Sequence, residues 1–306
     1  MKWLTSMIVA LSLLFAAELD AQAVKEKDLL AGKASLNPAM GYIFASFPSR
    51  FQGTLIRVPD AEDWESYRTD WEKGYQKALK KYDSDYRNWE QVRITAREYG
   101  RPIPPKPVQV PPREQFSIGP IEARLMVGFG AGDEYLKDKV VPVYRYLTAV
   151  KPGTYIWYGP FALIGTGSCY CMGTVKFEVK AATITDTGDF LLDVARYDGL
   201  TMDGKLNKEP GRFSSSPDGD GEIGPDAAHY GIPQSLSAFP AVRAEFHAAG
   251  KMNNIFSIMV SRLRPIPGIL GYRRGEVVDL RTGQVIQMQI APFDPNAEQD
   301  VDDEGD

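Results

Sequence analysis

Short apolar runs separated by glycine and proline recur along much of the chain. In one of them, apolar Val175, Phe177 and Val179 alternate with polar side chains, which is the two-residue period of a strand with one solvated face. Short strands at this spacing are typical of a β-sandwich or barrel. The pattern predicts a mainly β fold, with a sandwich formed by residues 24–59 and 114–200.

The hydrophobic period changes after Asp60, where large apolar side chains recur at steps of three and four residues. They are Trp64, Tyr67, Trp71, Tyr75, Leu79, Tyr82, Tyr86 and Trp89. This spacing places them on one stripe of a helix, and Asp60 is suited to cap its free amides. The pattern predicts a helix from Asp60 to about Arg97. Asp83-Ser84-Asp85 leaves open a break into two helices.

A proline-rich segment follows, with six prolines among the twelve residues from Arg101 to Pro112. Because each proline lacks a backbone donor and has a fixed φ, the segment is expected to be extended polyproline. Either its prolines fold back onto the row formed by Tyr75, Tyr82 and Trp89, or the segment is a solvated linker. An aromatic stripe is also found on sugar-binding surfaces, although it is more often a packing face. Residues 60–113 are predicted to be a helical and polyproline insertion between strands of the sandwich.

The remaining sequence is organised in three parts. Residues 201–254 are rich in Gly, Asp, Ser and Pro, which predicts loops with one short helix over residues 240–249. Residues 255–291 contain apolar runs that predict strands completing the same sheet system. Residues 292–306 are acidic, without a basic residue, and predict a disordered solubilising tail.

The first 23 residues have the three regions of a secretory signal peptide: Lys2, an apolar run from Met7 to Ala17, and the small-x-small pattern Ala21-Gln22-Ala23. The apolar run is shorter than the ~20 residues that a spanning helix needs. We therefore expect export to the periplasm or outside the cell, without a transmembrane segment in the mature chain. The formal charge of −5 comes mainly from the acidic tail, and a nearly neutral body argues against nucleic-acid binding.

Cys169 and Cys171 are the only cysteines in the sequence. In a straight strand their Cα atoms would be about 6.6 Å apart, so a disulfide requires the backbone to bend. Gly165, Gly167 and Gly173 flank the pair and permit such a bend. The pair is a local disulfide, two free thiols packed in the sheet, or a soft-metal or redox site.

Three sequence segments resemble a known family. They are Val150-Lys-Pro-Gly-Thr-Tyr, Lys176-Phe-Glu-Val-Lys and Ile184-Thr-Asp-Thr-Gly-Asp-Phe. The stretch over about residues 150–190 is similar to β-sandwich modules of the transthyretin-like or carboxypeptidase-regulatory type, in which a Pro-Gly-x-Tyr turn precedes a strand and a later strand ends in a Thr-Asp-x-Gly turn. The resemblance implies a β-sandwich, transthyretin-like or jelly-roll-like, that binds or braces rather than catalyses.

The sequence contains few residues arranged for chemistry. His229 and His247 are its only imidazoles, and a Cys-His nucleophile pair would require a reduced cysteine. The sequence has no Gly-x-Ser-x-Gly elbow, no phosphate-binding glycine loop and no His-Glu-x-x-His. These absences argue against catalysis and give no reason to expect a cofactor.

One loop has a partial calcium-binding pattern. Residues 216–223 resemble the first half of an EF-hand loop, with Asp218, Asp220 and Glu222 as the candidate ligands. Ala227 stands where a bidentate glutamate would close the site. A solvated Asp-Gly loop is therefore the favoured interpretation.

The sequence favours a non-catalytic binding or structural protein of the cell envelope. Its expected partner is an envelope protein or polymer. The alternative is a thiol-dependent enzyme, or a redox or metal-binding protein, centred on Cys169 and Cys171.

Overall fold

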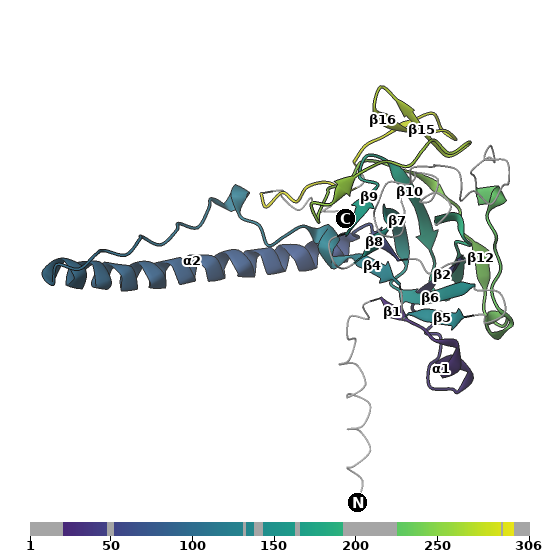
Figure 1. Ribbon diagram of the computed structural model, residues 1–306, viewed down its shortest axis with the longest axis horizontal. Coiled ribbons are helices and arrows are strands. Elements are labelled where there is room, and N and C mark those ends of the chain that lie inside the picture. Colours follow the sequence, from purple (N-terminus) through teal and green to yellow (C-terminus); the bar gives the residue numbers. More distant parts are fainter. Residues whose placement is uncertain are drawn as a thin grey trace, which may run out of the picture. The chain divides into compact units, whose positions relative to one another are not determined.

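The computed structural model describes residues 21–47, 52–130, 133–137, 143–162, 166–191, 225–288 and 290–296 (Figure 1). Within them the chain is mainly β, with several sheets and one long helix, as the sequence predicts. The chain forms two compact units. Unit 1 comprises residues 1–58 and 126–289, and unit 2 comprises residues 59–125 and 290–306.

The predicted signal peptide lies outside the described residues except for its last three. Of these, Gln22 and Ala23 form a short strand, β1, that pairs with Ala149 and Thr148. Cleavage before Val24 would remove this strand from its sheet.

The first sheet of unit 1 has six strands in the order β1-β6-β2-β11-β12, with β5 also paired to β6. Its longest pairing is antiparallel and joins seven residues of β2 to seven of β6. β11 runs parallel to both β2 and β12. The strands are β1 (Gln22–Ala23), β2 (Gly41–Phe47), β5 (Glu134–Lys137), β6 (Tyr144–Val150), β11 (Ile184–Asp186) and β12 (Ala241–Arg243). A short helix, α1 (Glu26–Leu30), follows β1.

The second sheet is antiparallel and has five strands in the order β13-β10-β7-β3-β4. In β10 the side chains of Val175, Phe177 and Val179 are buried, while Glu178 is exposed. The alternation predicted from the sequence is thus confirmed. The strands are β3 (Gly53–Arg57), β4 (Met126–Phe129), β7 (Gly153–Gly159), β10 (Thr174–Val179) and β13 (His247–Ala249).

A single hydrophobic cluster contains side chains from both sheets. Phe47 of the first sheet stacks on Phe129 of the second at a centroid distance of 5.8 Å, and Phe129 stacks on Trp157 at 6.1 Å. Trp157 is fully buried. Gly53 lies directly beneath it, since a Cβ at Gly53 would come within 2.4 Å of the indole ring. Close packing of large rings therefore dictates a glycine at this strand position.

The C-terminal strands lie in two smaller sheets and not in the six-stranded or five-stranded sheet, so the prediction that residues 255–291 complete the same sheet is wrong. One three-stranded sheet has the order β14-β9-β8, and another has the order β15-β16-β17. In the latter, the turn after β16 is closed by a bond from the Gly283 amide to the Asp279 carbonyl, at 2.7 Å. β15, β16 and β17 pair antiparallel with their neighbours in sequence, as in hairpins, whereas β14 pairs parallel with β9 from much earlier in the chain. The strands are β8 (Phe161–Ala162), β9 (Thr166–Cys169), β14 (Met259–Val260), β15 (Leu270–Arg273), β16 (Glu276–Asp279) and β17 (Val285–Ile286).

The prediction of a short helix over residues 240–249 is also wrong, because this segment forms the strands β12 and β13. Ala244, Phe246 and Ala248 are buried, and the residues between them are less buried. This two-residue period outweighs the helix propensity of alanine and glutamate. The described part of residues 201–254 instead contains two 3₁₀ turns, at Pro225–Ala227 and Gln234–Leu236.

Unit 2 is built on α2 (Ala61–Glu98), a helix of 38 residues. Asp60 and Asp63 form a reciprocal capping box at its start, which confirms the predicted cap. The helix continues through Asp83 and Asp85, so the alternative of two helices is wrong. Two 3₁₀ turns follow in the chain, at Arg113–Gln115 and Ile121–Arg124. The part of the chain that the structure describes contains no helix apolar enough along its length to cross a membrane.

The acidic tail differs from its prediction at its beginning. Phe293 packs against Trp64, Tyr67 and Trp71 of α2, with centroid distances of 6.3, 4.9 and 5.7 Å. The contacts of this partly buried ring give residues 290–296 a defined place in unit 2. Residues 297–306 lie outside the described residues.

Phe246 offers a test of the core of unit 1, because it is fully buried between Phe177 and Phe190. We expect Phe246→Ala to lower the free energy of unfolding by about 3–5 kcal/mol, through lost burial and the cavity left behind. The control is Val242→Ala at a half-exposed position of β12, where a change within about 0.5 kcal/mol is expected. Denaturant titration of both variants makes the comparison. Equal effects would contradict the position of Phe246 in the core.

Candidate functional site

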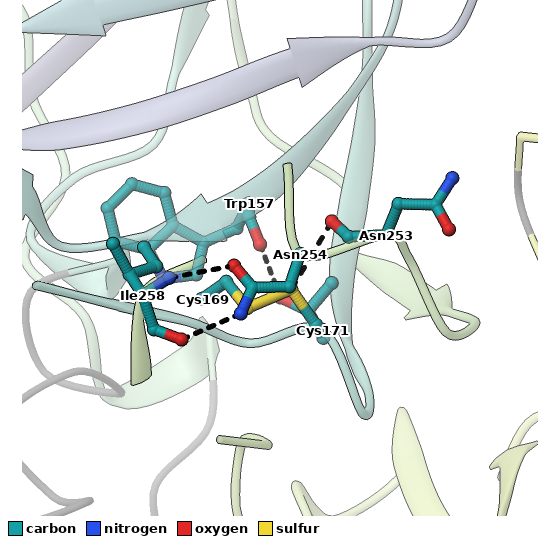
Figure 2. Close-up of a disulfide and its surroundings, with 7 residues drawn as sticks. Trp157, Cys169, Cys171, Asn253, Asn254 and Ile258 are labelled. Carbon is teal, nitrogen blue, oxygen red and sulfur yellow. Dashed lines mark hydrogen bonds between the residues drawn. A yellow bond between two sulfur atoms is a disulfide. The ribbon is translucent and has the colours of Figure 1, made fainter. Parts of the chain in front are cut away.

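The two cysteines form a disulfide at the end of β9 (Figure 2). Their Cα atoms are 5.1 Å apart, closer than in a straight strand, so the predicted bend is present. Gly173, which follows the pair, has a φ of +140°, a backbone conformation that favours glycine. Of the three interpretations of the pair, the structure contains the disulfide.

The disulfide is buried and held by backbone bonds on both sides. Cys169 is 0% exposed and Cys171 is 2% exposed. The carbonyl of Cys169 accepts from the Ser261 amide at 2.8 Å, and the carbonyl of Cys171 accepts from the Met252 amide at 2.9 Å. The bridged loop is therefore enclosed by the segment from Met252 to Ser261.

Figure 2 shows how this enclosing segment is itself fixed. The side chain of Asn254 donates to the Ile258 carbonyl at 2.7 Å and accepts from the Ile258 amide at 3.1 Å. The neighbouring carbonyl oxygen of Asn253 lies 3.5 Å from Sγ of Cys171. In a reduced protein this oxygen would be an acceptor for the Cys171 thiol.

The disulfide closes a loop of very few residues, since the cysteines are separated by two positions. In the chain-entropy account, closing so short a loop stabilises the fold by about 1.6 kcal/mol, compared with about 3 kcal/mol for a 15-residue loop. Its sulfur atoms are bonded and buried, so neither is a thiolate nucleophile or metal ligand in this state.

The two histidines lie beside carboxylates. His229 has Nδ1 2.9 Å from a carboxylate oxygen of Asp189, and its amide donates to the other oxygen at 2.7 Å. His247 has Nε2 3.7 Å from Glu245. The cysteine–histidine nucleophile considered from the sequence is not formed, because both sulfur atoms are used in the disulfide.

The Asp-Thr-Gly-Asp turn after β11 holds the segment around His229. Asp186 accepts from the amides of Gly188 and Gly231 at 2.9 and 2.7 Å. Burial raises the pKa of Asp186, and the two amide bonds oppose this increase. A Cβ at Gly188 would come within 2.5 Å of the His229 carbonyl. The turn is thus a backbone clamp, and the pairing of Asp189 with His229 is part of it.

The clamp extends to an aromatic ring beside it. Burial raises the pKa of Tyr230 to about 12. The guanidinium of Arg243 lies 4.4 Å from the centroid of the Tyr230 ring, which is within the range of a cation–π contact. These groups stabilise one another, and sequence analysis did not identify them.

The calcium candidates Asp218, Asp220 and Glu222 lie outside the described residues. Among the residues that are described, no cluster of three or more His, Cys, Asp or Glu side chains is arranged to hold a metal ion.

In unit 2 the chain reverses after α2 and runs back alongside it (Figure 1). We call α2 together with residues 99–118 the helix–proline arm. Trp89 donates from Nε1 to the Pro104 carbonyl at 2.9 Å, and Lys106 lies 5.1 Å from the Tyr86 ring centroid. The proline segment therefore folds back onto the helix, as one of the two sequence interpretations predicts.

The same antiparallel register continues toward the start of the helix. Arg113 forms an ion pair with Glu72 at 2.6 Å, and Trp71 donates from Nε1 to the Phe116 carbonyl at 3.0 Å. The contact at Lys106 and the one at Arg113 are separated by about 22 Å of polyproline. Their partners, Tyr86 and Glu72, are separated by about 21 Å of helix. The equal lengths explain how the two elements remain in register.

The predicted aromatic row makes these contacts only in part. Trp89 donates to a proline carbonyl, and Tyr75 packs on Phe116 with centroids 5.2 Å apart. Tyr82 packs on Tyr86 at 5.9 Å. Packing of a proline ring on one of these aromatic rings stays a prediction.

A hollow lies near the start of α2 and is lined by Arg68, Thr69, Trp71, Glu72, Lys73, Arg113, Phe293 and Pro295. Trp71 is only 1% exposed, so its ring is unavailable for stacking on a ligand. Arg113 lies 4.6 Å from the Trp71 ring centroid and lowers the pKa of Glu72 through their hydrogen bond. Trp71, Glu72 and Arg113 are thus already used in contacts with one another.

The arm carries the largest concentration of exposed apolar side chains in the part of the chain described. Twelve large hydrophobic residues are exposed among all the described residues, and five of these twelve lie between residues 92 and 108 of the arm. These five are Val92, Ile94, Tyr99, Ile103 and Val108.

Comparison with family models, curated proteins and solved structures finds no match to this chain. The candidate binding site therefore rests on the exposed apolar side chains of the arm.

Thiol titration tests the disulfide directly. We expect no reactive thiol in the native protein or in denatured, unreduced protein, and two after denaturation with a reductant, because the sulfur atoms are bonded. Two thiols reacting in the native state would contradict the disulfide. The Cys169→Ser/Cys171→Ser variant is the blank for each condition.

The bond from Trp89 to Pro104 tests the register of the arm. We expect Trp89→Phe to retain the helix and to speed amide exchange over its last two turns by about two- to tenfold. That range corresponds to the loss of one hydrogen bond. Hydrogen exchange read by mass spectrometry measures the effect. Tyr82→Phe, which retains the ring that packs on Tyr86, is the control, and equal exchange in both variants would argue against the bond.

Proposed function

We propose that this is an exported, non-catalytic binding protein in which unit 1 is a β-sandwich body and the helix–proline arm is the binding element. The observation that carries the proposal is the concentration of exposed apolar side chains between residues 92 and 108. Exposed apolar surface of this kind is typical of interaction sites. The partner is a component of the cell envelope, either a protein or a polymer.

The sandwich assignment is supported by the core of unit 1. Inward-facing side chains of the six-stranded and the five-stranded sheets belong to one hydrophobic cluster, as expected for two sheets packed face to face. The resemblance to transthyretin-like modules over about residues 150–190 agrees with this assignment. The strand arrangement we propose for the sandwich is transthyretin-like or jelly-roll-like. The resemblance implies a module that binds or braces rather than catalyses.

Export is supported by two independent features. The first 23 residues have the pattern of a signal peptide. The pairing of Cys169 with Cys171 agrees with an oxidising compartment, where disulfides persist. We therefore place the protein in the periplasm or outside the cell.

A second candidate function is redox chemistry at Cys169 and Cys171. The short loop favours this function. A disulfide that closes so short a loop contributes little to stability, so redox chemistry is a second reason for its presence. This function requires the native disulfide to be reduced by a small dithiol, with Asn253 accepting from the Cys171 thiol. Burial of both sulfur atoms opposes it, so we rank it below binding.

Site-specific photo-cross-linking tests the proposed function in the native organism. A benzophenone amino acid placed at Tyr99 or Val108 of the arm is expected to trap an envelope component, because both side chains are exposed. The control position is Val242 in unit 1, which is 50% exposed. Adducts that form equally from all three positions, or from none, would contradict the arm as the binding element.

A further inference from the structure

The end of the arm at which the chain reverses combines apolar and cationic side chains. We call residues 92–103 the tip. Four exposed apolar residues lie in it: Val92 is 42% exposed, Ile94 50%, Tyr99 65% and Ile103 44%. Arg97 and Arg101 are exposed among them. Apolar and cationic groups are thus interleaved within the last turns of α2 and the first residues of the proline segment that runs back along it, which we call the returning strand.

The apolar side chains surround the tip and do not form one flat face. At 100° per residue, Val92 and Tyr99 lie within about 20° of one another on the helix. Ile94 lies about 200° from Val92, on the opposite side. Ile103 adds a further side chain from the returning strand.

The tip has a fixed backbone. Gly100 adopts a φ of +63°, and its amide donates to the Arg97 carbonyl at 3.4 Å. The amide of Arg101 donates to the Ala96 carbonyl at 2.7 Å. These two bonds and the left-handed glycine form a Schellman motif. The reversal therefore holds Tyr99 and Arg101 at the end of the arm.

The charge of the tip is positive. Within residues 92–103 the chain has Arg93, Arg97 and Arg101, against Glu98 as the one acidic residue. Arg93 is paired with Glu90 in the preceding turn. A partner of complementary charge is therefore anionic.

We propose that the tip binds an anionic phospholipid surface, with its apolar side chains at the boundary of headgroups and acyl chains and with Arg97 and Arg101 on lipid phosphates. Tyrosine, aliphatic and basic side chains are the residues that favour this interface, and guanidinium groups match phosphate geometry. A fluid surface accommodates apolar side chains that project on opposite sides of a tip, whereas a folded protein would need a socket around it. The inference rests on the proposed role of the arm as the binding element, and it assigns the tip a lipid surface in the cell envelope in place of a protein or polymer.

Vesicle co-sedimentation of the full mature chain tests the proposal. We expect binding to vesicles of phosphatidylcholine containing phosphatidylglycerol, little binding to phosphatidylcholine alone, and weakening by salt. The Arg97→Glu/Arg101→Glu variant is expected to lose at least tenfold in apparent partitioning. The Tyr99→Asp variant, which places a charge at the most exposed apolar position of the tip, is expected to lose a similar factor.

The matched control is Lys77→Glu/Lys80→Glu, which makes the same change in charge at exposed positions in the middle of α2. It is expected to partition like the unmodified protein, and circular dichroism establishes that each variant retains its helix. Absence of binding to phosphatidylglycerol vesicles would overturn the proposal, and so would an equal loss in the control. If vesicles fail while arm positions still cross-link to a protein, the lipid assignment falls and the proposed binding function stands. If both experiments fail, both proposals fall.

Discussion

A polyproline strand has few backbone donors, and this limits how it can be attached to the rest of a protein. Because each proline lacks an N–H, the returning strand of the arm cannot form a regular ladder with a neighbour. Its carbonyl oxygens remain available, and the indole donors of Trp71 and Trp89 bind two of them, those of Phe116 and Pro104. Large amphipathic side chains on α2 therefore provide both the apolar surface and the donors that hold the strand.

The two units are stabilised by different interactions. In unit 1, side chains from two sheets bury one another in a common core, so stability comes mainly from apolar area removed from water. In unit 2, the helix has only three buried residues, Tyr67, Trp71 and Ala96. Its order depends on capping by Asp60, the contacts of Phe293 and the returning strand. The arm can thus present apolar side chains to a partner without depending on them for its own fold.

Local patterns predicted much of this structure. The three-and-four spacing of aromatic residues identified α2, and the alternation in residues 174–180 identified β10. What could not be predicted depends on distant partners. Phe293 packs on a helix more than 200 residues earlier in the chain, and Asp189 meets His229 across 40 residues, so no local period signals either contact. The strands of residues 240–249 did have a signal, the two-residue period of Ala244, Phe246 and Ala248, which alanine-rich composition obscured.

The register of the arm also constrains how its length can change during evolution. A helix advances 1.5 Å per residue and polyproline about 3.1 Å, so one residue added to the strand must be accompanied by about two added to the helix. Adding seven residues to the helix preserves the direction of the aromatic row and requires three or four in the strand. Insertions and deletions that keep both the pairing and the direction of the aromatic row therefore come in coupled steps of about 10.5 Å. The length of the arm therefore changes in discrete steps, each of which needs a matching insertion or deletion in the helix and in the proline segment.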